Sequence, residues 1–277
     1  MKHLILGSSG QIGSHFSRYL QHCNEDVIEY DIVRTSEEDI RNTNTQNLQH
    51  AIEQSDFVHF LAFDVGGSEY IKKYQYTYDF ISNNVKIMNN VFDILRITGK
   101  PFIFASSQMS NMSHTTYGIL KAIGEYYTKS LNGMMVRFWN VYGIEHDEAK
   151  LHVITDFMKS AKKDGIIKMK TDGEEFRQFL YADDCSECLY NLSVKYKYID
   201  TDKNLHVTNF EWISIYELAK IISQMHNNCP IERGTSKDTI QGAYKNEPDQ
   251  YILNFWKPKT TLLEGLNIIS KEIDRQM

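Results

Sequence analysis

The sequence predicts an α/β protein of the Rossmann type, with a doubly wound parallel sheet and a smaller C-terminal lobe that binds a substrate. Apolar stretches of strand length alternate with stretches of helical periodicity along the chain. The first apolar stretch, residues 3–6, leads directly into a glycine-rich turn between Gly7 and Gly13. Strands joined by crossover helices in this order form a parallel sheet, whose ligand crevice lies beyond the carboxyl ends of the strands.

The glycine-rich turn and the helix that follows it, to about His22, form the first candidate binding site. Glycines at this spacing permit a tight turn, close approach of the backbone to a pyrophosphate, and close packing of the helix on the strand. The anion is expected at the helix N-terminus. The residues expected to hold a dinucleotide here are Gly7, Ser9, Gly10, Gln11, Ile12 and Gly13.

A second strand, residues 27–30, ends at Asp31, which stands 18 residues after Gly13. A carboxylate in this place can bind both hydroxyls of the adenine ribose and would repel a 2′-phosphate, which predicts NAD as the cofactor. Arg34 leaves dual use of NAD and NADP open, because its guanidinium could reach the ribose. The alternative is an ordinary exposed Asp at the end of a strand.

The remaining elements of the first half follow in the same alternation. A polar loop spans residues 35–42 and a helix ends near residue 54. A strand covers residues 57–62, the Gly66-Gly67 pair breaks the pattern, and a long helix covers residues 77–98. Strands at 102–105 and 134–138 flank a helix that ends near residue 131. Asp31, Leu61, Ala62, Ser107 and Asn140 all fall at strand ends, so we expect them around one crevice.

Beyond residue 146 the periodicity weakens, and helices are expected at residues 151–163, 182–194 and 214–225. Residues 1–146 are therefore expected to form the dinucleotide-binding core. Residues 147–277 are expected to form mainly the substrate-binding lobe, with some segments returning to the core.

Tyr117 and Lys121 stand four residues apart in a predicted helix, which places a phenol and an ammonium on one face. A neighbouring cation lowers the pKa of a phenol and makes it a usable proton acceptor. Taken alone, the pair also fits a solvated helix surface. The cofactor turn at the start of the chain favours hydride-transfer chemistry.

Composition limits the alternatives. The net charge of −6 and the pI of about 5.9 argue against a surface that binds nucleic acid.

No apolar run approaches the ~20 residues of a membrane span, and no signal peptide is evident, so a cytoplasmic protein is expected. Cys185 and Cys188 form a Cys-x-x-Cys within a predicted helix, but no second Cys or His pair lies nearby, so we expect buried thiols and no metal.

Taken together, these residues resemble the extended short-chain dehydrogenase/reductases that act on nucleotide sugars, the epimerase/dehydratase group. The resemblance covers nearly the whole chain. Its marks are the three glycines, Asp31, Asp39-Ile40-Arg41, residues 56–62, Asn84, Ser106-Ser107, Tyr117 with Lys121, residues 137–143, residues 177–184 and Trp256-Lys257-Pro258.

The resemblance implies a role for each matching residue. Tyr117 would remove the proton from a sugar hydroxyl, Lys121 would hold the nicotinamide ribose, and Ser107 would hydrogen-bond the reacting oxygen. Further cofactor contacts are implied for Asp39, Ile40, Leu61, Ala62 and Asn84. Substrate contacts are implied for Gly66, Gly67, Gln108, Asn140 and Arg177, and either Arg233 or Lys245 would replace a C-terminal arginine of the family.

Departures from the family pattern narrow the reaction. Dehydratases of the family carry an Asp-Glu pair after the active-site serine, where this chain has Gln108-Met109. The Gly66-Gly67 pair resembles the branch that handles GDP-sugars, in which epimerases use a cysteine at the position of Met109. A thioether cannot exchange protons.

The expected function is therefore oxidation at C4 of a GDP-sugar with NAD, similar to the GDP-manno-heptose 4-dehydrogenases of bacterial capsule synthesis. A 4-epimerase or 4-ketoreductase is the close alternative, and a non-catalytic dinucleotide-binding regulator is the remote one. A homodimer is expected through second apolar faces of the helices at 77–98 and around Tyr117, including Ile119, Ile123 and Tyr126.

Overall fold

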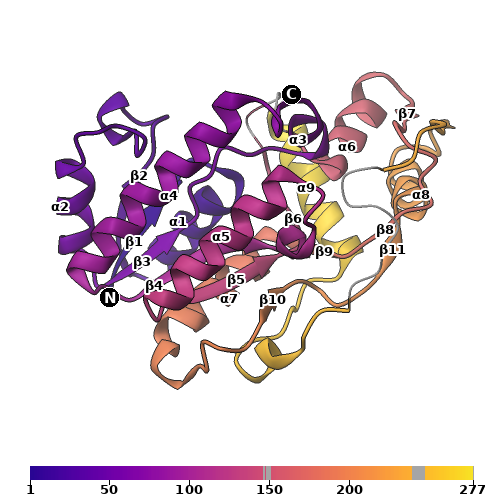
Figure 1. Ribbon diagram of the computed structural model, residues 1–277. Coiled ribbons are helices and arrows are strands. Elements are labelled where there is room, and N and C mark those ends of the chain that lie inside the picture. Colours follow the sequence, from indigo (N-terminus) through magenta and orange to yellow (C-terminus); the bar gives the residue numbers. More distant parts are fainter. Residues whose placement is uncertain (146, 148–150, 239–246, 277) are drawn as a thin grey trace.

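A computed structural model describes residues 1–145, 147, 151–238 and 247–276, and it shows a central parallel sheet between two layers of helices, with a second lobe at one end (Figure 1). The sheet has the strand order β10-β5-β4-β3-β1-β2, and each pair is parallel. Its strands are β1 (Lys2–Leu6), β2 (Asp26–Tyr30), β3 (Phe57–Phe60), β4 (Phe102–Ser107), β5 (Met134–Phe138) and β10 (Leu205–Val207). The predicted fold class is confirmed.

Both faces of the sheet are covered. The helices α2 (Gln46–Gln54), α4 (Tyr78–Thr98) and α5 (Thr116–Ser130) pack on the face that includes Leu4 and Leu6. The helices α1 (Gln11–His22) and α7 (Ala182–Val194) cover the face that includes Ile5. Alternate residues of one strand thus enter different cores, which explains why the strands are continuously apolar.

Local capping fixes the two helices beside the crevice. Thr77 precedes α4 and accepts a hydrogen bond from the Phe80 N–H at 3.3 Å, and Gly99 ends the helix in the left-handed region, at φ 60°. Thr115 caps α5 in the same way, through the Gly118 N–H at 3.0 Å. The α5 cap fixes where the helix begins, and the buried face of the helix carries Tyr117 and Lys121.

The strand order reverses between β1 and β3, and this point positions the binding site. Gly7 follows β1 with φ +89°, and a Cβ at this position would lie 2.8 Å from the Ala62 Cα. Only glycine permits both the backbone conformation and the close approach of the two strand ends.

The second lobe has its own core, built from α6 (Val153–Lys163), α8 (Ile215–Met225) and α9 (Leu262–Gln276). Its short strand pairs are β6 (Asn140–Tyr142) with β9 (Phe179–Tyr181), β7 (Ile167–Lys168) with β12 (Ile231–Glu232), and β8 (Phe176–Arg177) with β11 (Ile213–Ser214). Segments from the second half also join the core: β10 extends the sheet, α7 packs against α1, and Ile252 and Trp256 are buried in the same hydrophobic cluster. A domain boundary at residue 146 stays a prediction.

Three elements differ from the expectation. A short helix, α3 (Ser68–Tyr74), follows the Gly66-Gly67 pair, and a 3₁₀ turn, η1 (Ser36–Glu38), lies in the polar loop. The strand expected at residues 57–62 ends at Phe60, and Leu61 and Ala62 line the cavity beyond its end. Cys185 and Cys188 are buried free thiols in α7, as predicted. Among the described residues, no helix has the length and hydropathy needed to cross a bilayer.

Candidate active site

A cavity of about 1120 Å³ brings most of the predicted site residues together. It extends from the glycine turn, past the ends of β2, β3 and β4, to the second lobe. The predicted residues that line it are Gly7, Ser9, Gly10, Gln11, Ile12, Gly13, Asp31, Asp39, Ile40, Leu61, Ala62, Gly66, Gly67, Ser107, Tyr117, Lys121, Asn140 and Arg177.

The N-terminus of α1 fits a pyrophosphate. Gly10 caps the helix without a side-chain hydrogen bond, and the first turn carries no acidic residue. A Cβ on Gly13 would lie 2.1 Å from the Gly7 carbonyl oxygen, so glycine is required for the tight turn. The buried Gln11 side-chain nitrogen has no hydrogen-bond partner within the described part of the chain. Free N–H donors and the helix dipole favour an anion here.

The corner expected to hold the adenine ribose is acidic. Asp31 accepts hydrogen bonds from the Ser9 and Val33 N–H groups, both at 2.9 Å. Glu38 accepts a hydrogen bond from the Asp31 N–H at 2.7 Å and also lines the cavity. Arg34 pairs with Glu29 and with Glu38, so its guanidinium is held by two carboxylates. This arrangement favours ribose hydroxyls over a 2′-phosphate and therefore NAD over NADP.

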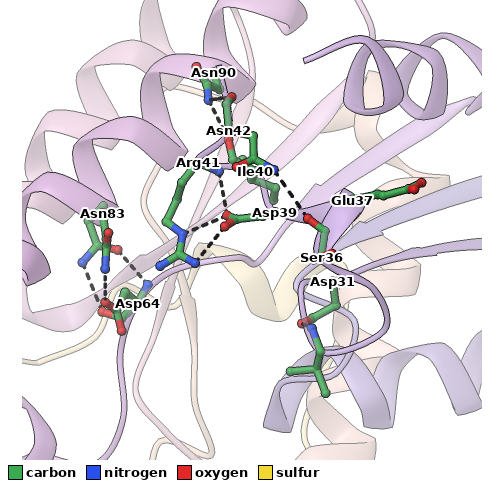
Figure 2. Close-up of polar contacts among 12 residues, drawn as sticks. Asp31, Ser36, Glu37, Asp39, Ile40, Arg41, Asn42, Asp64, Asn83 and Asn90 are labelled. Carbon is green, nitrogen blue, oxygen red and sulfur yellow. Dashed lines mark hydrogen bonds and ion pairs between the residues drawn. The ribbon is translucent and has the colours of Figure 1, made fainter. Parts of the chain in front are cut away.

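Asp39 and Arg41 form a bidentate ion pair at the cavity wall (Figure 2), with N–O distances of 2.8 and 2.9 Å. The Arg41 hydrogen bonds hold the pKa of Asp39 below its usual value. The Asn90 side chain donates to the Ile40 and Asn42 carbonyls at 2.6 and 3.0 Å, which anchors this loop on α4. The loop expected beside the adenine is therefore fixed by helix side chains.

Asn84 does not line the cavity, which corrects its expected direct contact with the cofactor. Its side-chain oxygen accepts from the Asp64 N–H at 2.7 Å, and its nitrogen donates to the carbonyls of Asp64 and Phe80. Asn83 donates to the Asp64 carboxylate at 3.0 Å (Figure 2). Both polar atoms of Asn84 are thus used to hold the backbone that follows β3.

The Tyr117 phenol is buried beside Ser107, at the end of β4. Burial raises the pKa of Tyr117 to about 12, and a hydrogen bond with Ser107 opposes this shift. Lys121 is not among the groups that shift this pKa in the structure, so its expected lowering of the Tyr117 pKa stays a prediction. Desolvation disfavours the charged form of the phenol, so a neighbouring cation must stabilise the phenolate before Tyr117 can accept a proton.

Lys121 is 3% exposed and donates to the Ala105 carbonyl at 2.6 Å. Its Nζ lies 3.6 Å from the centroid of the Phe63 ring and 5.8 Å from that of Tyr117. Burial lowers the pKa of Lys121 to about 7, although Glu125 raises it in part. The predicted pair thus shares one buried face of α5, and the lysine contacts an aromatic ring that the spacing did not indicate.

Asn140 and Arg177 line the part of the cavity nearer the second lobe. The Asn140 side chain donates to the Gln178 carbonyl at 3.1 Å. Arg177 donates to the Phe176 carbonyl at 2.6 Å and forms an ion pair with Asp238, which also lines the cavity.

Two other predicted substrate residues lie elsewhere. Gln108 lines a separate hollow of about 340 Å³, which shares Trp139 with the main cavity. Arg233 is outside the cavity lining, because it donates to the Asp172 carbonyl at 2.7 Å and stacks on Tyr216 at 4.6 Å. Lys245 lies outside the described residues.

The cavity also holds a pair that the sequence did not reveal, Glu145 and His152. Their side chains are 2.5 Å apart, and the His152 N–H donates to the same carboxylate at 2.9 Å. Burial opposes ionisation of Glu145, but hydrogen bonds to His152 bring its pKa below the usual value. A carboxylate-bound imidazole can accept or deliver a proton. The sequence between these two residues carries no recognisable motif, so no sequence signal marked the pair.

Met109 lines the cavity two residues after Ser107 and is 2% exposed. Its thioether has no proton to exchange, so Met109 does not supply an acid beside Ser107 and Tyr117. Among the described residues, no group of three or more His, Cys, Asp or Glu side chains is arranged to hold a metal ion.

Comparisons with known proteins agree with this geometry. Residues 3–207 match the model of the NAD dependent epimerase/dehydratase family. Over its whole length the chain is 25% identical to GDP-mannose 3,5-epimerase of Arabidopsis thaliana, of which the match covers 84%.

Solved structures share the fold. An epimerase from Methanothermobacter thermautotrophicus has a TM-score of 0.85 at 18% identity, with 99% of this chain and 92% of that chain covered. The UDP-glucose 4-epimerase of Thermotoga maritima, solved with UDP-glucose, has a TM-score of 0.82 at 17% identity, covering 100% and 99%. The UDP-glucuronic acid 4-epimerase of Bacillus cereus, solved with UDP-glucuronic acid and NAD, has a TM-score of 0.83 at 18% identity and full coverage of both chains.

The family model covers well over half of the chain, and the site residues fit the cofactor that the family uses. The protein therefore belongs to the NAD dependent epimerase/dehydratase family and is an NAD-dependent enzyme.

Proposed function

We propose that the protein oxidises C4 of a nucleotide-activated sugar with NAD, as a GDP-sugar 4-dehydrogenase, with a GDP-manno-heptose as the favoured substrate and surface-polysaccharide synthesis as its role. The observation that carries this proposal is the composition of the cavity wall. Ser107 and Tyr117 supply one proton acceptor beside the cofactor turn, and Met109 follows where a second proton donor would stand.

Each of four residues has a separate role in the proposed reaction. The bound NAD supplies a hydride acceptor. Ser107 donates a hydrogen bond to the reacting sugar oxygen, and the Tyr117 phenolate takes the hydroxyl proton, so that a ketone forms at the carbon that loses hydride. Lys121 would hold the cofactor's ribose hydroxyls, and the Arg177 guanidinium would hold the sugar's diphosphate.

The test is incubation of purified protein with NAD and a panel of GDP- and UDP-sugars, with the products followed by NMR. A 4-keto sugar formed with an equivalent of reduced cofactor supports the proposal. A C4-inverted sugar without net redox change would establish a 4-epimerase instead, and a product seen only when NADH and a keto sugar are supplied would establish a 4-ketoreductase.

A second candidate is epimerisation at a carbon beside the keto group, which the Glu145–His152 pair favours because it adds a proton-transfer group to the cavity. The similarity to a GDP-mannose 3,5-epimerase also supports this second candidate. In D₂O this activity would place deuterium at C3 or C5 of the recovered sugar, and His152→Gln would abolish that exchange while leaving C4 oxidation.

We also propose a homodimer. The faces of α4 and α5 that point away from the sheet expose large apolar side chains, among them Tyr78 at 81% and Tyr126 at 77%. Ile119 and Ile123 are exposed on the same outer side of α5, and α4 packs beside α5 (Figure 1). An apolar patch shared by two neighbouring helices suits a two-fold interface.

A further inference from the structure

Phe63 is an aromatic side chain that lines the active-site cavity directly after β3, against the catalytic pair of α5. Its ring centroid lies 3.6 Å from the Lys121 Nζ. The same ring meets the Tyr117 ring edge to face, at a centroid distance of 5.8 Å and an interplanar angle of 80°. One side chain thus contacts both residues of the pair.

The backbone on both sides of Phe63 is fixed. The Leu61 N–H donates to the Leu6 carbonyl at 3.0 Å, and the Asp64 N–H donates to Asn84 at 2.7 Å. The Asp64 carboxylate accepts from Tyr70 at 2.6 Å and from Asn83 at 3.0 Å. The position of the ring is therefore set by hydrogen bonds on either side of it.

Few other groups near Lys121 stabilise its protonated form. Lys121 donates a hydrogen bond to the Ala105 carbonyl, and the Phe104 ring lies farther away than the Phe63 ring, at 5.2 Å. Tyr117 and Glu125 are the titratable groups that face it from its own helix. Glu125 is bound by Arg137 of β5 at 2.8 and 2.7 Å and by Ser106 of β4 at 2.6 Å, so much of its charge is already compensated. The carbonyl and the Phe63 ring face are thus the closest groups that stabilise the ammonium.

We infer that Phe63 is a positioning residue for the catalytic pair, whose ring face holds the Lys121 ammonium in place and keeps it protonated within the buried site. A ring face stabilises only the cation, and such contacts are strongest when water is excluded. Burial lowers the pKa of Lys121 to about 7, so a large fraction of this side chain would be a neutral amine at physiological pH without further stabilisation of the cation. A neutral amine would hold the cofactor's ribose less firmly and would not support a phenolate on Tyr117.

This inference rests on the proposed use of Tyr117 and Lys121, but its test needs no substrate. The full-length protein, labelled with ¹³C-lysine, is titrated by NMR, and the Lys121 signal is assigned by its loss in Lys121→Arg. Phe63→Leu should lower the pKa of Lys121 by about half a unit or more, because the ring face is lost while the volume is nearly kept. Phe63→Tyr keeps an aromatic ring at this position and should therefore show the wild-type pKa of Lys121.

Phe157→Leu serves as the matched control, since Phe157 lines the same cavity from α6 and does not contact Lys121. It should leave the Lys121 titration unchanged. If Phe63→Leu does not fold, Phe63→Met fills the site without a ring and should show the same lowered value. A Lys121 pKa in the folded Leu or Met variant equal to that of the wild type would overturn the inference.

With an identified substrate, the alkaline limb of the kcat/KM profile of Phe63→Leu should move to lower pH by the shift that NMR measures. The proposed C4 oxidation and the proposed role of Phe63 can be disproved independently. If no C4-oxidised product forms, the proposed function is wrong, but the NMR comparison of the Lys121 pKa is still valid. If the Lys121 pKa is unchanged in the Phe63 variants, the proposed role of Phe63 is wrong, but the proposed reaction is unaffected.

Discussion

At the residue scale, burial governs the charge states of Tyr117 and Lys121, the pair proposed to carry the chemistry. A spacing of four residues fixes which side chains share a helix face, and Tyr117 and Lys121 do share the buried face of α5. Spacing does not report solvent access, and burial controls the pKa of both groups. The contacts of Asn84 and Arg233 were equally hidden, because their partners are backbone groups distant in sequence.

Tyr117→Phe removes the proton acceptor and leaves the aromatic packing in place. We expect kcat to fall by ~10²-fold or more, with NAD binding retained, because general base catalysis contributes at least this much. Steady-state kinetics on the identified nucleotide sugar, with NAD titrated by fluorescence, check this. Undiminished turnover would show that Tyr117 is not the proton acceptor.

Asp238→Asn should strengthen nucleotide binding, because the carboxylate competes with a phosphate for Arg177. We expect the Kd for GDP or UDP to fall by roughly fivefold, measured by calorimetry, which corresponds to about 1 kcal/mol. Asp202→Asn removes the same charge from an exposed pair with Lys129 and should leave the Kd unchanged. Weaker binding in Asp238→Asn would show that Arg177 needs its partner in order to bind phosphate.

At the element scale, long periodic segments were predictable and short ones were not. The expected bounds of α4 and α7 and the expected end of α5 agree with the structure to within about a residue, because apolar periodicity marks these helices locally. The helix α3 is only seven residues long, and the paired strands of the second lobe have two or three residues each. Such elements depend on tertiary partners that a local pattern does not contain.

The turn between β1 and α1 gives an element-scale prediction. In Gly13→Ala the new methyl group would lie 2.1 Å from the Gly7 carbonyl oxygen, so the turn must open. We expect loss of measurable NAD binding and a destabilisation of about 1–3 kcal/mol in urea unfolding. In Gly10→Ala the nearest atom is 3.4 Å away, so this variant should fold with wild-type stability. Normal NAD affinity in folded Gly13→Ala would contradict the assigned anion site.

At the scale of the whole molecule, the sheet core contains a histidine pair that ties stability to pH. His3 and His59 lie 3.0 Å apart on neighbouring strands, and neither is exposed. Burial lowers the pKa of His3 to about 4 and that of His59 well below 6.5. Both rings are therefore neutral in the folded protein, whereas they would titrate near 6.5 when unfolded.

Because these folded-state pKa values are depressed, their contribution to stability is complete above pH 6.5 and is lost as the pH falls below it. Each histidine should contribute a slope of up to ~1.4 kcal/mol per pH unit to the free energy of unfolding. Denaturant melts between pH 7.5 and 5 should show this loss, and His59→Phe should reduce the slope. Equal slopes in the two proteins would mean that His59 titrates normally.

The apolar outer face of α4 and α5 makes a prediction about assembly. Sedimentation equilibrium should give twice the chain mass of 32.3 kDa at micromolar concentration. Tyr126→Glu places a charge on that face and should yield a folded monomer, whereas Tyr198→Glu changes an equally exposed tyrosine outside it and should stay dimeric. A monomeric wild-type protein would rule out the proposed interface.

The central claim is that Tyr117 and Ser107 deprotonate a sugar hydroxyl while the hydride of the same carbon passes to the nicotinamide. The most direct test uses a GDP-sugar deuterated at C4, incubated with the protein and NAD, with deuterium located by NMR and mass spectrometry. We predict that deuterium appears in the reduced nicotinamide and that the sugar becomes a 4-ketone. Deuterium retained at C4 of a sugar that is nevertheless converted would contradict the account.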